Sequence, residues 1–125
     1  YDLAKAILAQ QNRSAMTILE ELIYLRYQPT VILAALSGAY MDLYIAKSAL
    51  AAGKGQAEIA KSFEYRGRDF VIRNSLRDCR KYSPESLRRS IAYLAQTDRR
   101  MKSSRADNNI LLEQAVTELF LIARE

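Results

Sequence analysis

The 125-residue sequence contains no histidine, and its one cysteine is Cys79. Without histidine the chain cannot form a Ser-His-Asp triad, a Cys-His pair, a histidine zinc site or a Glu-x-x-His di-iron site. A single cysteine excludes an intrachain disulfide and a cysteine metal cluster, which is typical of a reducing compartment. We interpret Cys79 as an inert core thiol. The sequence therefore predicts no catalytic residue, no metal site and no cofactor.

Glycine and proline are also scarce, with 4 Gly and 2 Pro. Gly53-Lys54-Gly55 lacks the preceding Gly and the following Ser or Thr of a phosphate-binding loop, so we interpret it as a turn between helices. The longest uncharged run covers residues 27–41 and suits a buried core helix better than a membrane span. No signal peptide is visible, and we expect a cytoplasmic protein with no membrane contact.

The abundant residues are Ala, Leu, Glu, Lys, Arg and Gln, which favour helices. We predict an all-α domain, a compact bundle of about seven helices over residues 1–125. Helix start signals include Ser14 as an N-cap, Pro29 in a first turn, Asp69 as a cap, and Ser83 followed by Pro84. The expected helices cover roughly residues 2–11, 15–28, 30–51, 56–63, 69–81, 84–102 and 109–124.

The last expected helix has more apolar residues than one neighbour can cover. One stripe of the helix faces the core, and further apolar residues lie off that stripe. We predict a subunit interface at these residues, Leu111, Phe120 and Ile122.

Positive charge is concentrated in one part of the chain. The net charge is +5, but residues 61–105 hold 13 Lys and Arg against 5 Asp and Glu, while the other residues hold 6 against 9. This distribution indicates either an anionic partner, a nucleic acid or an acidic protein face, or simply a solvated surface.

The segment from residue 56 to residue 81 reads as helix, turn and helix. We expect Ile59, Ala60 and Phe63 to point inward from its first helix. The second helix carries a basic stripe that could contact phosphates or an acidic partner: Arg73, Arg77, Arg80 and Lys81. The turn is longer than in compact DNA-reading motifs, and Asn74 and Ser75 are the available base readers. A nucleic-acid-binding module is therefore the alternative function, with non-specific contact favoured over sequence reading.

Asp98 occupies an apolar slot on the sixth expected helix, in line with Leu94 and Met101. A carboxylate in such a slot must be paired or must cap another helix; Lys102, one turn further along, and the nearby Arg99 or Arg100 are the candidate partners. The spacing predicts a buried structural pair of Asp98 and Lys102, not a catalytic acid.

Several short motifs in a fixed order resemble a known family. They run from Tyr1-Asp2-Leu3 through Ile18-Leu19-Glu20-Glu21-Leu22, Tyr44-Ile45-Ala46-Lys47, Ala52-Gly53-Lys54, Glu58-Ile59-Ala60-Lys61, Arg80-Lys81-Tyr82-Ser83, Glu85-x-Leu87-Arg88-Arg89 and Leu94-Ala95-x-x-Asp98 to Lys102-Ser103. Together they resemble the C-terminal collar domain of the delta subunit of the bacterial DNA polymerase III clamp loader, over nearly the whole chain.

The resemblance implies a non-enzymatic oligomerisation domain of a longer subunit in a DNA-directed DNA polymerase holoenzyme. Two N-terminal AAA+-type domains would precede it, and the first of them would contact the sliding clamp. The implied partners are the other clamp-loader subunits, of the gamma/tau and delta-prime type, with DNA contacted at most indirectly. Because the sequence begins with Tyr1, we expect it to be a part of such a longer protein.

Overall fold

The computed structural model describes residues 2–63, 65, 67–103 and 105–124. Within these residues the fold is entirely helical, with seven α-helices, one short 3₁₀ helix and no strand. In chain order the elements are α1 (Asp2–Leu8), α2 (Asn12–Tyr24), α3 (Pro29–Ala51), α4 (Gln56–Ser62), α5 (Asp69–Asp78), η1 (Cys79–Lys81), α6 (Pro84–Ser103) and α7 (Asn108–Ala123). The predicted all-α, seven-helix fold is confirmed.

Local sequence signals set several of the helix boundaries. Pro29 occupies the first turn of α3, and Ser83 caps α6, with its Oγ accepting a hydrogen bond from the Ser86 backbone N–H at 3.0 Å. Asp107 caps α7 in the same way through the Asn109 N–H at 2.8 Å. Two predicted caps are wrong, because α2 already begins at Asn12, two residues before Ser14, and Asp69 lies inside α5.

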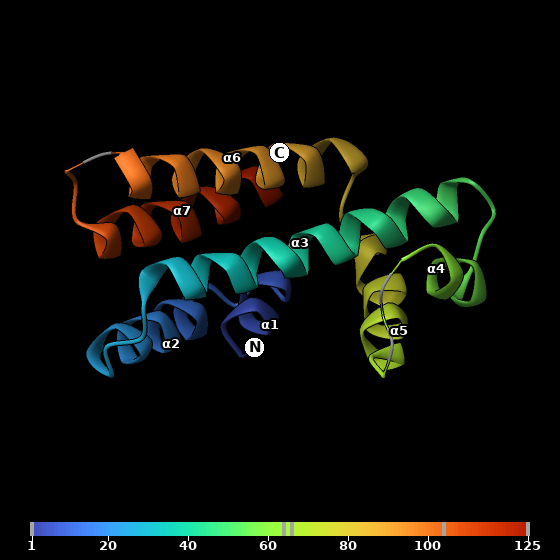
Figure 1. Ribbon diagram of the computed structural model, residues 1–125, viewed down its shortest axis with the longest axis horizontal. Helices are drawn as coiled ribbons and strands as arrows, with labels where there is room; N and C mark the ends of the chain where they lie inside the picture. The colour runs from blue at the N-terminus through green and yellow to red at the C-terminus, as the bar shows by residue number, and fades with distance from the viewer. Residues whose placement is uncertain (1, 64, 66, 104, 125) are drawn as a thin grey trace.

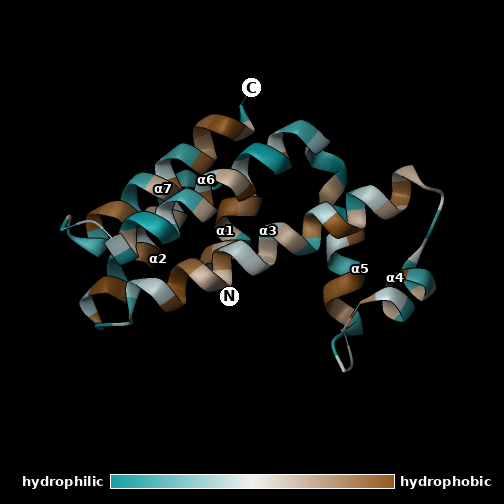
Figure 2. Ribbon diagram, turned by 45° about the horizontal axis from the view of Figure 1, so that its top comes forward, coloured by the Kyte–Doolittle hydropathy of each residue, from teal (hydrophilic) through white to brown (hydrophobic). Residues whose placement is uncertain are grey.

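Helix α3 runs the length of the molecule, and the other helices are arranged along it (Figure 1). Over most of its length, from Ile32 to Ala46, it packs with α1, α6 and α7, and α2 packs on α1 and α7; these five helices form the main body. Its core is a large continuous cluster that includes Leu19, Leu36, Leu87, Leu94 and Leu112. Figure 2 shows apolar turns on α3 and at the C-terminal end of α7.

By length and composition, α3 is long and apolar enough to cross a membrane. Its most buried side chains, among them Leu33, Leu36, Tyr40 and Leu43, all belong to the main core. These contacts are those of the central helix of a helical domain, as the uncharged run predicted.

Helices α4 and α5 form a hairpin at one end of α3 (Figure 1). A second, small cluster holds this hairpin, with Ile59, Tyr65 and Ile72 buried against Ile45 and other side chains of α3. Leu76 packs against both this cluster and the main core, so it joins the two regions. The hairpin thus depends on far fewer buried side chains than the main body.

A polar latch ties the turn between α4 and α5 to α3. The Tyr65 hydroxyl donates a 2.6 Å hydrogen bond to Asp42 Oδ1, and Arg68 Nη2 lies 4.0 Å from Asp42 Oδ2. The Arg68 guanidinium also stacks over the Tyr65 ring, 5.5 Å from its centroid. Burial, followed by the hydrogen bond to Asp42, raises the pKa of Tyr65 well above its usual range. Tyr65 therefore stays protonated and keeps donating to Asp42 at neutral pH.

Candidate functional site

The described part of the chain holds no group of three or more Cys, Asp or Glu side chains that could bind a metal ion. Cys79 is buried, its Sγ lies 3.4 Å from the Leu76 carbonyl oxygen, and burial raises the pKa of the thiol. A protonated, buried thiol is a poor nucleophile. The surfaces that the sequence singled out as candidates are binding surfaces.

The predicted interface residues on α7 lie in the core instead. Leu111, Phe120 and Ile122 are 2%, 8% and 2% exposed. The expectation that they lie off the covered stripe is wrong for a physical reason: α7 is covered by α1, α2, α3 and α6 of its own chain, not by one neighbour. A helix that is apolar all round is expected at such a central place.

One face of α7 nevertheless remains uncovered. Ile110 and Leu121 are 52% and 49% exposed, at positions eleven residues apart and therefore three helical turns along the same face. Between them a hollow of about 430 Å³ opens at the junction of three helices. It is lined by Met16 of α2, Tyr93 of α6, and Ile110, Glu113, Gln114, Thr117 and Glu118 of α7.

The predicted basic residues are all exposed, and only the last of them, Lys81, departs from the predicted stripe. Regular helix α5 ends at Asp78, and the chain continues as η1. A 3₁₀ helix turns 120° per residue instead of 100°, so Lys81 rotates away from the face that Arg73 and Arg77 share, whereas Arg80 stays on it. Arg77 is also paired with its neighbour, since its Nε lies 2.9 Å from Asp78 Oδ1.

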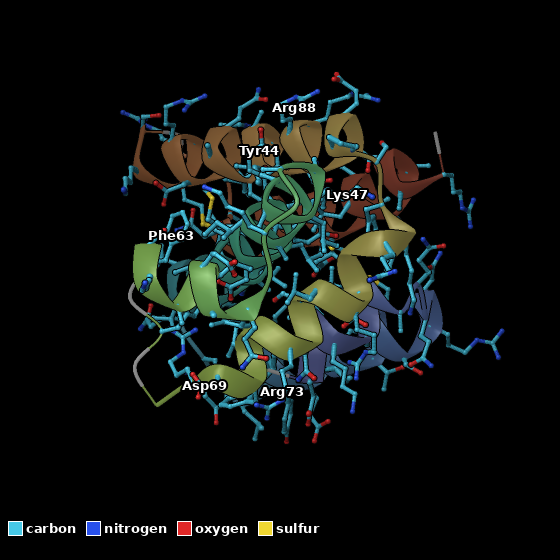
Figure 3. The ribbon with its side chains drawn as sticks, turned by 90° about the vertical axis from the view of Figure 1, so that its right-hand side faces the viewer. Tyr44, Lys47, Phe63, Asp69, Arg73 and Arg88 are labelled. Carbon is cyan, nitrogen blue, oxygen red and sulfur yellow. The ribbon has the colours of Figure 1, made fainter. Side chains whose placement is uncertain are left out.

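Figure 3 shows how widely the cations are distributed over this end of the molecule. Arg73 lies on α5 at the lower edge of the view, close to Asp69, whereas Arg88 lies at the upper edge beside Tyr44. The positive charge is thus spread over the end and is interrupted by carboxylates. Among the residues that the structure describes, such a surface provides a diffuse field for an anionic partner rather than a convergent phosphate site.

The helix-turn-helix arrangement exists, with α4 packed on α5, but its details differ from the prediction. Ile59 points inward, whereas Ala60 and Phe63 are exposed. Ser75, one of the two expected base readers, is buried. A buried serine cannot reach a base edge, so the structure disfavours sequence-specific reading by α5.

Asp98 and Lys102 do form the predicted pair, with 2.9 Å between Nζ and Oδ2, but the pair is not buried. Their side chains are 44% and 71% exposed. The buried slot on α6 belongs to Thr97, whose Oγ1 donates to the Tyr93 carbonyl oxygen at 3.0 Å. The prediction was wrong by one helical position, because the buried face of α6 turns toward Ser90 and Thr97.

Sequence reasoning missed the latch of Asp42, Tyr65 and Arg68. Asp42 and Tyr65 are 23 residues apart and belong to different elements. No helical period links such positions, so the signal was absent from local spacing. The available hint was Asp42 itself, a carboxylate on the largely apolar helix α3.

Comparisons with known proteins agree with one another. The family model described as DNA polymerase III delta subunit, C-terminal domain, matches residues 1–119. The solved structure of the Bacillus subtilis DNA clamp loader delta protein (YqeN) is similar, with a TM-score of 0.85 and 26% sequence identity. The match covers 96% of this chain and 35% of that chain, so the sequence spans about a third of its structural relative. No curated protein matches the sequence.

Proposed function

Because the chain belongs to the family of C-terminal domains of the DNA polymerase III delta subunit, we propose that it is the collar of a clamp-loader delta subunit. In this role it holds its subunit in the loader and helps to place the sliding clamp on DNA during replication. The observation that supports this function best is the agreement of sequence family and fold over almost the whole chain.

The proposal includes the rest of the subunit and its partners. Two AAA+-like domains precede the collar, and the first of them contacts the sliding clamp. The collar itself binds the other loader subunits, of the gamma/tau and delta-prime type, in the cytoplasm. It is an accessory domain of the polymerase holoenzyme and performs no catalysis, in keeping with a sequence that has no histidine.

Size-exclusion chromatography with light scattering tests this function. The chain is run alone and then mixed with the other clamp-loader subunits of the same organism. We expect a larger complex that contains this chain in the mixture. If the chain elutes separately from every partner at micromolar concentrations, the collar function is wrong.

A second function is supported by the exposure of Arg73, Arg80 and Lys81. We propose, as the alternative, non-specific contact with the nucleic-acid backbone at the α5–η1 end. Duplex DNA binding that weakens with salt and is lost on reversal of these charges would support it. Absence of binding at low salt would exclude it.

A further inference from the structure

The uncovered face of α7 carries a wide, open hollow at its junction with α2 and α6. Helices α2 and α6 flank this face, and their side chains Met16 and Tyr93 form its two walls. A groove between parallel ridges of side chains is the surface on which a further helix packs. Ile110 and Leu121, about 16 Å apart along the α7 axis, supply an apolar anchor toward each end.

The polar residues of the groove select the charge of its occupant. Glu113 and Glu118 line the hollow between the two anchors, and Glu113 is exposed. Neither carboxylate has an ion-pair partner among the residues that the structure describes. An incoming helix with Lys or Arg beside its apolar stripe would neutralise both carboxylates as it buries the anchors.

We propose that this α7 groove (Met16, Tyr93, Ile110, Glu113, Gln114, Thr117, Glu118 and, one turn on, Leu121) is the docking site for a basic amphipathic helix of another protein of the clamp loader. The proposal rests on the proposed collar function and names the surface through which it acts. Charge complementarity identifies the occupant, because two unpaired carboxylates disfavour an acidic helix there.

Binding of the loader partners to substituted chains tests the groove. Dissociation constants are measured for the purified gamma/tau-type and delta-prime-type subunits against the wild-type chain, Ile110→Asp with Leu121→Asp, and Glu113→Lys with Glu118→Lys. We expect the apolar double variant to weaken binding at least tenfold. The charge-reversed variant should weaken it severalfold at low salt, with a smaller effect at high salt.

A matched control places the same change on another apolar surface. Tyr24 and Val31, at the corner between α2 and α3, are as exposed as the groove anchors or more so. Tyr24→Asp with Val31→Asp should leave partner binding unchanged. Because all substituted positions of the apolar variants are exposed, both variants should keep the helical circular dichroism of the wild type.

The outcomes separate the two proposals. If the wild-type chain binds no partner, the collar function fails, and the docking site fails with it. If the wild type binds and the groove variants bind equally well, the docking site alone is wrong. Loss of binding by the corner variant only, or tighter binding after charge reversal, also overturns the docking site. If the wild type forms a homodimer that the groove variants abolish, the occupant is a second copy instead.

A photo-crosslinker at Gln114 checks the chemistry of the occupant directly. Gln114 is exposed and lines the hollow. Mass spectrometry of the crosslinked complex should identify a partner peptide rich in Lys or Arg with apolar residues at helical spacing. An acidic peptide, or one without that spacing, would contradict the proposal.

Discussion

The main body and the α4–α5 hairpin share the long helix α3, yet different interactions hold them. The main body buries a continuous cluster of side chains from α1, α2, α3, α6 and α7. The hairpin buries Ile59, Tyr65 and Ile72 and adds a polar latch to Asp42. Because hydrophobic stabilisation grows with the buried apolar area, the main body carries most of the stability of the chain.

This difference shows that one chain can contain regions of unequal stability although every segment is helical. A region with few buried contacts can open locally at a lower free-energy cost than the global unfolding of the protein. The hairpin is therefore expected to exchange its backbone amides before the main body does. The predictions below test that contrast, beginning with the largest expected effect.

Leu112→Ala should destabilise the whole molecule. Leu112 is fully buried in the main core, and its truncation leaves a cavity that costs about 3 kcal/mol. Urea unfolding followed by circular dichroism measures the loss. A change below about 1 kcal/mol would show that the main core can collapse around the cavity and is less tightly packed than its burial indicates.

Ile72→Ala should act locally, on the hairpin. It removes one of the buried side chains of the small cluster and should cost about 2 kcal/mol, at the lower end of the range for core truncation. Hydrogen exchange with mass spectrometry should show faster exchange in α4 and α5, with unchanged protection in α7. Equal loss of protection in both regions would mean that the chain unfolds as a single unit.

Tyr65→Phe should weaken the latch while keeping the ring in place. The substitution removes the hydrogen bond to Asp42, which is worth about 1.5 kcal/mol, the lower end of the range for a charged acceptor. Amide exchange in α4 and α5 should again accelerate, but less than in Ile72→Ala. Phe70→Leu serves as a control, since Phe70 lies on the exposed side of α5 and should leave exchange unchanged.

Alkaline pH should lower the free energy of unfolding of both regions, and the loss that comes from Tyr65 in the hairpin can be measured separately. The pKa of Tyr65 is raised above the ordinary value of 10.0, mainly by burial. Above pH 10 the unfolded chain loses this proton while the folded chain keeps it, so the stabilisation is full below pH 10 and declines as the pH rises. The pKa values of Tyr40 and Tyr82 in the main body are raised in the same direction.

Urea unfolding at pH 8 and at pH 11 measures this effect. The wild type should lose stability between the two pH values, and Tyr65→Phe should lose less. If the two proteins lose the same amount, the hydroxyl of Tyr65 ionises as freely in the folded chain as in the unfolded one.

Asp98→Asn should have the smallest effect. The Asp98–Lys102 pair is an exposed contact one helical turn apart, and such pairs contribute about 0.3–0.5 kcal/mol. Thermal unfolding at low and high salt should show a small difference that disappears at high salt. A loss above about 1 kcal/mol would mean that the carboxylate is more buried in solution than in this structure.

The sequence was sufficient to predict the helices, because their signals are local. Pro29 and Ser83-Pro84 mark helix starts that the structure confirms. The surface was harder to predict, since periodicity identifies an apolar residue but not the number of neighbours that cover it. For this reason the sequence predicts an interface at Leu111, Phe120 and Ile122, although α7 has neighbours on several sides.

The remaining misses have equally physical origins. The Asp98 prediction depended on the rotation of α6, and one helical position, 100° of rotation, separates Asp98 from the buried Thr97. The basic stripe assumed a regular helix to Lys81, whereas the change to η1 after Asp78 turns Lys81 away from the stripe. Neither the rotation of a helix nor a change of helix type has a strong signature in residue spacing.

Because α3 is continuous through both regions, the position of the hairpin is tied to that of the main body. With 23 residues, this helix is about 35 Å long, and no proline interrupts it after its first turn. Its buried side chains from Ile32 to Ala46 all belong to the main core, and the hairpin packs on Ile45 and Ala49, so both regions are mounted on one rigid helix. Whatever shifts the main body therefore also shifts the hairpin.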